Sequence, residues 1–278
     1  MQIPPIIFGT FQYQNQRELS PIVNSAYENG IIGFDTSPSY HTEEFLGAAL
    51  EELCTSKEIR RQDLFIQDKI DGWQMEEAKG KISCHVETSI AKLHCNYIDA
   101  LFIHWPFVTG KHDVELVLPE TWQAFSDLKK QGKVRLIGLS NVRERHVKKL
   151  MEETGIRPDV VQIERHPLRT CKNDVRYFQS EGITVEAYSP VCRMDKRLAD
   201  SAILKSIAQK YKKSTGQVIL RWHIDTGVIP VFMTKKEARI KENVDIFDFS
   251  LVPEELKAIS ELDINYKIFV ESACCPGI

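Results

Sequence analysis

Polar side chains that can exchange protons recur at one kind of position in this sequence, directly after a short apolar run. They are Asp35 with Tyr40, Lys69, His104, Ser140 with Asn141, Gln162, and Tyr188 with Ser189. If the runs are parallel strands, the residues that follow them gather at one end of the sheet, where α/β proteins place their chemistry. A carboxylate, a phenol, an amine and an imidazole together suit acid–base or Schiff-base chemistry. The combination therefore predicts a catalytic site.

Taken one at a time, these residues have simpler interpretations. Lys69 can be a solvated strand end, and Asp35 can cap the turn that follows it. His104, which precedes Trp105 and Pro106, can be a hydrogen-bonded histidine of the core. Only their joint occurrence favours chemistry.

The residues around Asp35 show how a fold would position this set. An apolar run at 31–34 is typical of a buried strand, and the turn-forming residues 36–39 break it. Carboxylates followed by a second apolar run predict a helix over 43–53. Asp35 is thus expected at the carboxyl end of a strand, with Tyr40 on the loop beyond it.

Eight short apolar runs alternate with segments of helical periodicity along the chain. The expected strands are 6–11, 31–36, 64–69, 97–105, 134–140, 160–164, 183–188 and 228–232. The expected helices are 17–29, 43–53, 75–93, 119–130, 144–153, 173–180, 200–224, 236–244 and 253–262. No linker-like or low-complexity segment divides the series. We therefore predict a single α/β domain over residues 1–278, a (β/α)8 TIM barrel.

The composition argues against several classes of function. The net charge is -3 and the Lys and Arg residues are dispersed, so no nucleic-acid binding is expected. No apolar run approaches the roughly 20 residues of a membrane span, and the N-terminus lacks the features of a signal peptide. The 7 Cys residues, an odd number without a CxxC pair, predict a reduced protein in the cytoplasm.

Two Cys–His pairs, at 84–85 and 94–95, invite a metal-site interpretation. They are too far apart on one expected helix, because two ligands on one helix face need the spacing of a single turn. We therefore predict ordinary thiols and no metal.

Several motifs resemble those of the aldo-keto reductases, in particular the small monomeric members typified by bacterial diketogluconate reductases and aldose reductase. The resemblance runs from Phe8 to about Leu251. Its motifs are Gly33-Phe34-Asp35-Thr36 with Tyr40, Lys69, Leu101-Phe102-Ile103-His104-Trp105-Pro106, Gly138-Leu139-Ser140-Asn141-Val142, Val161-Gln162-Ile163-Glu164 with His166-Pro167, Ala187-Tyr188-Ser189-Pro190, and Arg239-Ile240-Lys241-Glu242-Asn243. Their order and spacing make the match far more specific than any single motif.

The resemblance implies a catalytic tetrad of Asp35, Tyr40, Lys69 and His104. Reduction of a carbonyl by hydride builds negative charge on its oxygen, so Tyr40 would donate a proton to that oxygen as the general acid. The ordinary pKa of a tyrosine is near ~10, and the Lys69 ammonium would lower it while Asp35 positions the lysine. His104 would orient the carbonyl and donate a hydrogen bond to it. The implied activity is the reduction of an aldehyde or ketone to an alcohol.

A nicotinamide dinucleotide, by default NADPH, is the cofactor that the resemblance implies. It would bind without a GxGxxG motif, which this sequence lacks. Ser140, Asn141 and Gln162 would hold its carboxamide, Tyr188 would stack on the nicotinamide ring, and Ser189 would lie near the pyrophosphate. The other expected cofactor residues are Gly9, Thr10, Asp35, Arg239, Glu242 and Asn243.

The chain departs from its relatives at the site expected for the 2'-phosphate of NADP. Many relatives carry Pro-Lys-Ser where this sequence has Pro230-Val231-Phe232. A basic contact is therefore missing at that position, and Lys235, Lys236 or Arg239 is left to supply it. NADH stays open as a cofactor beside NADPH.

Other departures lie closer to the expected pocket. His41 follows Tyr40 where relatives usually have glycine, and Val191-Cys192-Arg193 replaces the usual Leu-Gly after Pro190. The first expected strand begins almost at residue 1, which leaves little chain for the hairpin that closes the barrel in many relatives.

The expected substrate is a small carbonyl compound, whose identity and preferred direction of reaction stay open. Phe11, Trp73 and Trp105 are expected to line an apolar pocket around Tyr40 and His104, together with the segments 107–117 and 268–278. Trp73 fits ordinary core packing equally well. We expect a monomer, the commonest state among the relatives.

Two other functions fit part of the pattern. A barrel that has kept the cofactor and lost catalysis would be a dinucleotide-binding regulatory protein, as the altered loop and His41 allow. A phosphate-handling isomerase or lyase would use Lys69 as a Schiff-base amine and His104 as a base, but the cofactor-type motifs would then be unexplained. The complete tetrad favours the reductase.

Overall fold

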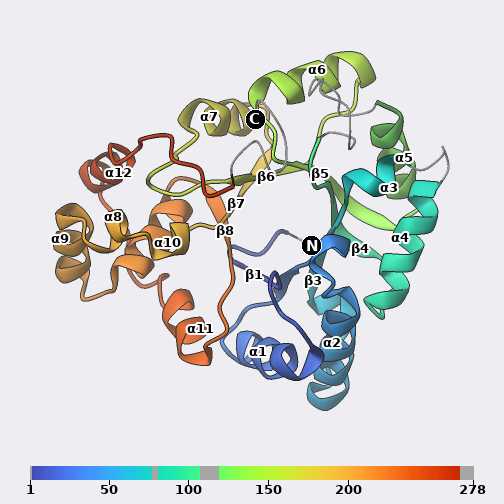
Figure 1. Cartoon of the computed structure of the whole chain (residues 1–278), viewed down its shortest axis with the longest axis horizontal. Coiled ribbons are helices and arrows are strands. Elements are labelled where there is room, and N and C mark those ends of the chain that lie inside the picture. The colour runs from blue at the N-terminus through green and yellow to red at the C-terminus, as the bar shows by residue number, and fades with distance from the viewer. Residues whose placement is uncertain (1, 77–80, 107–118, 270–278) are drawn as a thin grey trace.

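A closed barrel of eight parallel strands forms the centre of the computed structural model, which describes residues 2–76, 81–106 and 119–269 (Figure 1). The strands are β1 (Ile7–Gly9), β2 (Gly33–Asp35), β3 (Phe65–Ile70), β4 (Ile98–Ile103), β5 (Val134–Ser140), β6 (Val160–Glu164), β7 (Thr184–Tyr188) and β8 (Val228–Phe232). They pair in chain order, and β1 closes the barrel by pairing with β8. The predicted (β/α)8 barrel is confirmed.

Helices surround the barrel on its outside, as Figure 1 shows. They are α1 (Gln16–Glu28), α2 (Glu43–Lys57), α3 (Gly72–Glu76), α4 (Lys81–Lys92), α5 (Pro119–Lys130), α6 (Glu144–Thr154), α7 (Lys172–Ser180), α8 (Lys196–Ala199), α9 (Ala202–Tyr211), α10 (Thr215–Asp225), α11 (Glu237–Val244) and α12 (Pro253–Ser260). Short 3-10 turns are η1 (Pro38–Tyr40), η2 (Arg61–Asp63) and η3 (Cys192–Met194). None of the helices in the described part of the chain has the length and apolar character needed to span a membrane.

The expected helical stretch 200–224 is divided in the structure into α9 and α10. Lys212 ends α9 with a left-handed backbone, φ 56°, and its N–H caps the carbonyls of the last turn. Ser214 then begins α10 with a capping box, in which its hydroxyl accepts from the N–H of Gln217. The polar residues between two apolar runs therefore mark a boundary that the periodicity alone did not resolve.

The interior of the barrel is filled by side chains rather than left open. Phe65, Phe102, Val160 and Val231 belong to one buried cluster contributed by different strands. Gly138 on β5 makes room for it, since a Cβ at this position would lie 2.6 Å from a ring carbon of Phe102. A packed interior supports the strand ends above it as a rigid platform.

Candidate active site

The carboxyl ends of the strands open into a cavity of about 520 Å³, here called the main cavity. Its size suits a small-molecule site. Twelve residues that the sequence predicts for the site line it: Gly9, Phe11, Asp35, Tyr40, His104, Trp105, Ser140, Asn141, Gln162, Tyr188, Ser189 and Asn243. The barrel thus brings the expected catalytic and cofactor residues to one place.

Lys69 and Asp35 form a buried ion pair beside this cavity. Nζ of Lys69 lies 2.7 Å from Oδ1 of Asp35 and donates to the carbonyl oxygen of Thr36 at 2.7 Å. Gln67 and Gln162 also donate to Oδ1 of Asp35, at 2.8 and 3.1 Å. Burial opposes the charged form of Lys69, but the neighbouring Asp35 outweighs it and the pKa of Lys69 is raised. Lys69 is therefore an ammonium and Asp35 its counter-ion.

Tyr40 reaches the cavity from η1, the turn that follows β2. Pro38 begins this turn, and His41 ends it with a left-handed backbone, φ 57°. The Tyr40 ring lies 4.7 Å from Nζ of Lys69, and its hydroxyl is 3.4 Å from Nε2 of His104. The four residues of the expected tetrad are therefore contiguous in space.

Burial, rather than the lysine, dominates the acidity of Tyr40. Its loss of water contact raises the pKa, the Lys69 charge lowers it, and the net pKa is about 12. Lys69 lowers the pKa of Tyr40 as expected, but burial outweighs it, so the pKa lies above its ordinary value and not below it. The phenol is therefore fully protonated at neutral pH and ready to donate.

An acidic partner for His104, Asp71, was not among the residues predicted from the sequence. Oδ1 of Asp71 lies 2.5 Å from Nδ1 of His104. The other oxygen accepts from the N–H of Ser39 at 2.9 Å and from the hydroxyl of Ser37 at 3.2 Å. Burial would raise the pKa of Asp71, yet its bonds to His104, Ser39 and Ser37 hold that pKa below its ordinary value. Asp71 is therefore ionised.

The contact with Asp71 determines which nitrogen of His104 carries the proton. Burial lowers the pKa of His104, so the ring is neutral at neutral pH. A carboxylate at Nδ1 favours the tautomer with its proton there, which leaves Nε2 as a hydrogen-bond acceptor facing Tyr40. The sequence-based expectation was that His104 donates a hydrogen bond to the substrate carbonyl. A donation from Nε2 would require the imidazolium form of His104, which is the less populated one.

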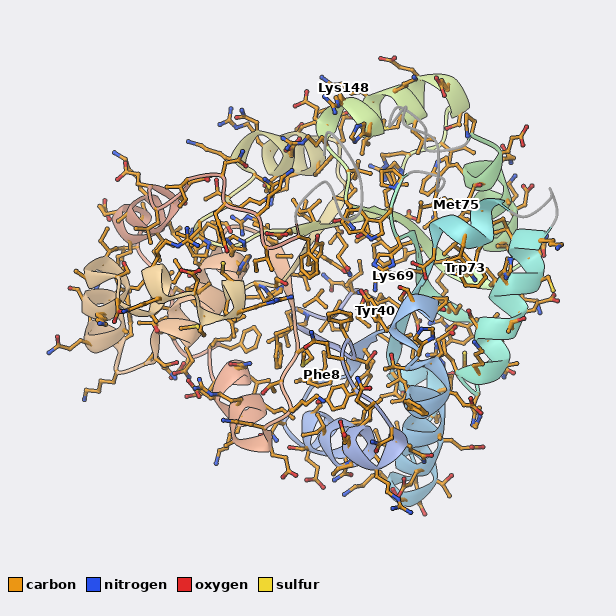
Figure 2. All side chains as sticks on the ribbon, viewed as in Figure 1. Phe8, Tyr40, Lys69, Trp73, Met75 and Lys148 are labelled. Atoms are coloured by element: carbon orange, nitrogen blue, oxygen red, sulfur yellow. The ribbon has the colours of Figure 1, made fainter. Side chains whose placement is uncertain are left out.

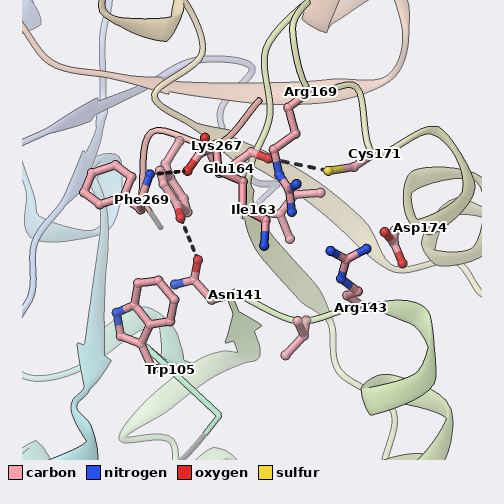
Figure 3. A pocket seen from close by; sticks show the side chains of 12 residues that line it. Trp105, Asn141, Arg143, Ile163, Glu164, Arg169, Cys171, Asp174, Lys267 and Phe269 are labelled. Atoms are coloured by element: carbon pink, nitrogen blue, oxygen red, sulfur yellow. Dashed lines mark hydrogen bonds between the residues drawn. The ribbon is translucent and has the colours of Figure 1, made fainter. Parts of the chain in front are cut away.

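The opposite side of the cavity is built from β5, β6 and β7. Asn141 has a left-handed backbone, φ 58°, and its side-chain amide donates to the carbonyl oxygen of His104 at 2.9 Å. The Tyr188 hydroxyl donates to Oδ1 of Asn141 at 2.6 Å (Figure 3). Gln162 is tied to Asp35 through its Nε2. These bonds fix the side chains of Asn141 and Gln162, which are expected to hold the carboxamide, and the ring of Tyr188, which is expected to stack on the nicotinamide.

Besides Lys69, which lies beside the main cavity, four of the expected site residues do not line it. Thr10 is buried below it and bonds the Asp35 carbonyl oxygen at 2.9 Å. Arg239 and Glu242 pair at 3.2 Å on α11, where Glu242 directly precedes Asn243. Trp73 is 51% exposed on α3, further out than Tyr40 and Lys69 in Figure 2, and its ring packs against His85. Trp73 is therefore not among the described residues that line the main cavity.

The residues that depart from the family pattern do not all lie at the main cavity. Val231 and Arg193 line the main cavity, whereas His41 is exposed and does not. Cys192, Arg193 and Met194 all have φ between 50 and 53°, a run of left-handed residues without glycine. Such backbones cost on the order of 1 kcal/mol each, so packing must hold this loop in place. Arg193 is the basic group that the loop brings to the cavity.

A buried carboxylate, Glu186 on β7, was also missed. Gln67 and Gln162 both donate to its Oε2, each at 2.9 Å. Its other oxygen, Oε1, is buried with no hydrogen-bond partner among the described residues. Burial raises the pKa of Glu186 to about 7. Glu186 lies inside an apolar run of the sequence, between Val185 and Ala187, and thus looked like part of a strand body.

No metal site is found in the part of the chain that the structure describes. His94 lies beyond the end of α4, with φ 48°, and Nδ1 contacts Glu51 at 2.7 Å. His85 on α4 packs against Trp73. The Cys–His pairs therefore have separate, structural surroundings.

Comparison with known proteins agrees with this geometry. Residues 5–264 match the model of the aldo/keto reductase family. An uncharacterized oxidoreductase YtbE from Bacillus subtilis is 37% identical over 96% of this chain and 92% of its own, and a glyoxal reductase from the same organism is 35% identical over the same shares. The crystal structure of a Bombyx mori aldo-keto reductase in complex with NADP superposes with a TM-score of 0.89 at 33% identity, covering 98% of this chain and 92% of that one. The chain belongs to the aldo/keto reductase family.

Proposed function

We propose that the protein reduces an aldehyde or ketone to the alcohol with NADPH, and that Tyr40 is the general acid. The observation that carries this proposal is the position of the Tyr40 hydroxyl, 3.4 Å from His104 and beside the Lys69–Asp35 pair, on the main cavity. A protonated phenol over a buried ammonium suits proton donation to an oxygen on which charge builds.

The residues around the cavity fit a nicotinamide dinucleotide. Asn141 and Gln162 present amides at one end, Tyr188 presents a ring held by Asn141, and Arg193 and Asn243 line the cavity further along. The bound cofactor would supply a hydride to the carbonyl carbon. The Tyr40 proton would go to the carbonyl oxygen, so the two additions together complete the alcohol.

Each charged group around Tyr40 has a separate part in the proposal. Lys69, held by Asp35, stabilises the phenolate that remains after the proton has left. His104 accepts from the Tyr40 hydroxyl through Nε2 and orients it, while Asp71 fixes the His104 ring. The oxygen of the substrate would displace Nε2 as the acceptor of the Tyr40 proton.

The preference for NADPH rests on basic residues near Asn243. Among the described residues, Arg239 pairs with Glu242 at 3.2 Å and Lys235 with Glu18 at 3.1 Å, and both basic side chains are exposed. Exposed pairs contribute about 0–1 kcal/mol, so a 2'-phosphate could replace either carboxylate. Arg239→Gln should raise the KM for NADPH by roughly tenfold, the loss of one charged contact, and leave that for NADH unchanged.

Oxidation of NADPH and NADH with 4-nitrobenzaldehyde tests the proposal. Tyr40→Phe should lower kcat by about 10²-fold or more, as expected for loss of a general acid, and should leave dinucleotide binding intact. Tyr27→Phe on α1, remote from the cavity, is the matched control. If the protein binds the dinucleotide but oxidises neither cofactor with any reactive aldehyde, the reductase is rejected in favour of a dinucleotide-binding regulatory protein.

A further inference from the structure

A second, smaller pocket of about 30 Å³ adjoins the main cavity, and we call it the basic pocket (Figure 3). Four residues line both: Trp105, Asn141, Tyr188 and Phe269. The basic pocket lies beyond these residues, between the carboxyl ends of β5 and β6, the start of α7 and the segment 263–269. A molecule in the main cavity could therefore extend one group into it.

Three cationic side chains point into the basic pocket from different elements, as Figure 3 shows for Arg143, Arg169 and Lys267. Arg143 follows β5, Arg169 lies on the loop between β6 and α7, and Lys267 comes from the segment 263–269. Arg169 is only 7% exposed, so its charge is largely removed from water. Burial of a guanidinium is costly unless an acceptor or an anion compensates it.

The two arginines lack part of this compensation. Nη1 of Arg169 donates to Oδ1 of Asn265 at 2.6 Å, an uncharged partner. Within the described residues, the Nε atoms of Arg143 and Arg169 are both buried with no hydrogen-bond partner, and no ion pair involves either residue. Two guanidinium donors at one small pocket are therefore unused.

The two carboxylates at the basic pocket are occupied elsewhere. Glu164 accepts from the backbone N–H of Ile268 at 2.7 Å and of Phe269 at 3.1 Å, and from Nε2 of His166 at 3.1 Å. Asp174 accepts from the backbone N–H of Glu144 at 2.8 Å. Among the described residues, neither carboxylate forms an ion pair with Arg143 or Arg169.

We infer that the basic pocket binds the carboxylate of a carbonyl substrate whose aldehyde or ketone group lies at Tyr40. Each guanidinium offers an unused Nε–H to a carboxylate oxygen, and such charge-assisted bonds are stronger than neutral ones. The volume of about 30 Å³ exceeds the roughly 10–15 Å³ that one water needs, which suits a carboxylate better than a bulkier phosphate. The inference rests on the proposed function, and it adds an acidic substrate class to it.

The test compares 2-, 3- and 4-carboxybenzaldehyde with the matching nitrobenzaldehydes, which have nearly the same shape without the negative charge. The wild-type protein should show a kcat/KM at least about tenfold higher for one carboxy isomer than for its nitro counterpart. Arg143→Gln should abolish that preference by raising the KM for the carboxy isomer. The kcat/KM for the nitro compounds should stay within about twofold of wild type. Arg176→Gln, an exposed arginine on α7 that does not line the pocket, should change neither series.

The outcomes separate this inference from the proposed function. Reduction of the nitro compounds with no carboxylate preference, or a preference that Arg143→Gln preserves, overturns the anion site and leaves the reductase standing. If no aldehyde of either series is reduced, the proposed reductase function is rejected. Titration with terephthalate then decides the anion site, because binding at least about tenfold weaker in Arg143→Gln supports it and equal binding overturns it.

Discussion

Nδ1 of His104 lies 2.5 Å from Oδ1 of Asp71 because both residues end neighbouring strands at the same level. Ile70 on β3 pairs with Ile103 on β4, and the N–H of His104 donates to the Ile70 carbonyl oxygen at 2.9 Å. The residue after each strand therefore faces the other across the top of the barrel. This places a carboxylate behind the imidazole that faces Tyr40.

Asp71→Asn should alter the acid limb of the pH profile. Asp71 raises the pKa of His104 against the larger lowering by burial, so its removal should lower that pKa further. The acid limb of kcat/KM that reports His104 should then move to lower pH. The value at neutral pH should fall about 10-fold to 100-fold, since a hydrogen bond to a charged group contributes about 1.5–3 kcal/mol.

Rates measured between about pH 5 and pH 9 with saturating NADPH would show this shift. Asp63→Asn is a matched control, because Asp63 is an exposed carboxylate that pairs with Arg60. A variant with a lower rate but an unmoved acid limb would mean that Asp71 acts only on stability.

Lys69→Met should destabilise the fold more than replacement of both members of the ion pair. The single change leaves the Asp35 carboxylate buried with the amides of Gln67 and Gln162 as its remaining side-chain donors among the described residues. Breaking a buried pair in this way costs about 3–5 kcal/mol of unfolding free energy, whereas removing both charges costs less. Urea unfolding of Lys69→Met, Asp35→Asn and the double variant would give the coupling, and strictly additive losses would contradict it.

Glu186→Gln should make the protein more stable at pH 8 than at pH 5, relative to wild type. The folded-state pKa of Glu186 is about 7, above the ordinary 4.5, so the native state binds more protons between these values. The stability of the wild-type protein therefore falls as pH rises from about 4.5 to 7, by on the order of 3 kcal/mol, and stays low above that. Gln keeps an oxygen for Gln67 and Gln162 and has no charge to ionise.

Unfolding free energies at the two pH values would measure this effect. Glu237→Gln, at an exposed position of α11, should show no such change with pH. A wild-type minus variant difference that is constant with pH would show that Glu186 remains ionised or protonated throughout.

The sequence was sufficient for the barrel because eight short apolar runs alternate with helical segments, and a polar residue follows several of the runs. The same pattern predicted Asp35, Lys69 and His104, which the structure brings together. Asp71 was missed although it also follows a strand, because the expected strand ends at Lys69 whereas β3 extends to Ile70. An error of one residue in the predicted end of the strand therefore left this carboxylate out of the predicted site.

The sequence pattern also did not predict the pKa of Tyr40 or the grouping of cationic side chains, because both depend on which residues meet in the folded chain. The Tyr40 pKa depends on how completely the ring is buried, and that depends on residues from several strands. The basic pocket joins Arg143, Arg169 and Lys267, which are far apart along the chain. Only the closed barrel and the course of the segment 263–269 bring these cations to one pocket.

Glu164→Gln should release the segment 263–269 from the cavity. The carboxylate accepts the N–H groups of Ile268 and Phe269 with both oxygens, whereas an amide has only one acceptor oxygen and would set its NH2 against the other N–H. Phe269, which lines the main cavity and packs at 5.6 Å from the Tyr188 ring, would then lose its support. The KM for 4-nitrobenzaldehyde should rise about tenfold, the loss expected for one charged hydrogen bond, with little change in kcat.

The pH dependence separates this anchoring role from a general loss of stability. Burial opposes ionisation of Glu164, but its bonds to His166, Ile268 and Phe269 lower the pKa below the ordinary 4.5. Its contribution is therefore fully present above about pH 4.5 and is lost as the pH falls through the lowered pKa. Tryptic cleavage after Lys267 should be faster in Glu164→Gln at neutral pH, and Glu254→Gln on α12 should cleave like wild type. Equal cleavage in all three proteins would mean that other contacts, such as Arg169 with Asn265, suffice to hold the segment.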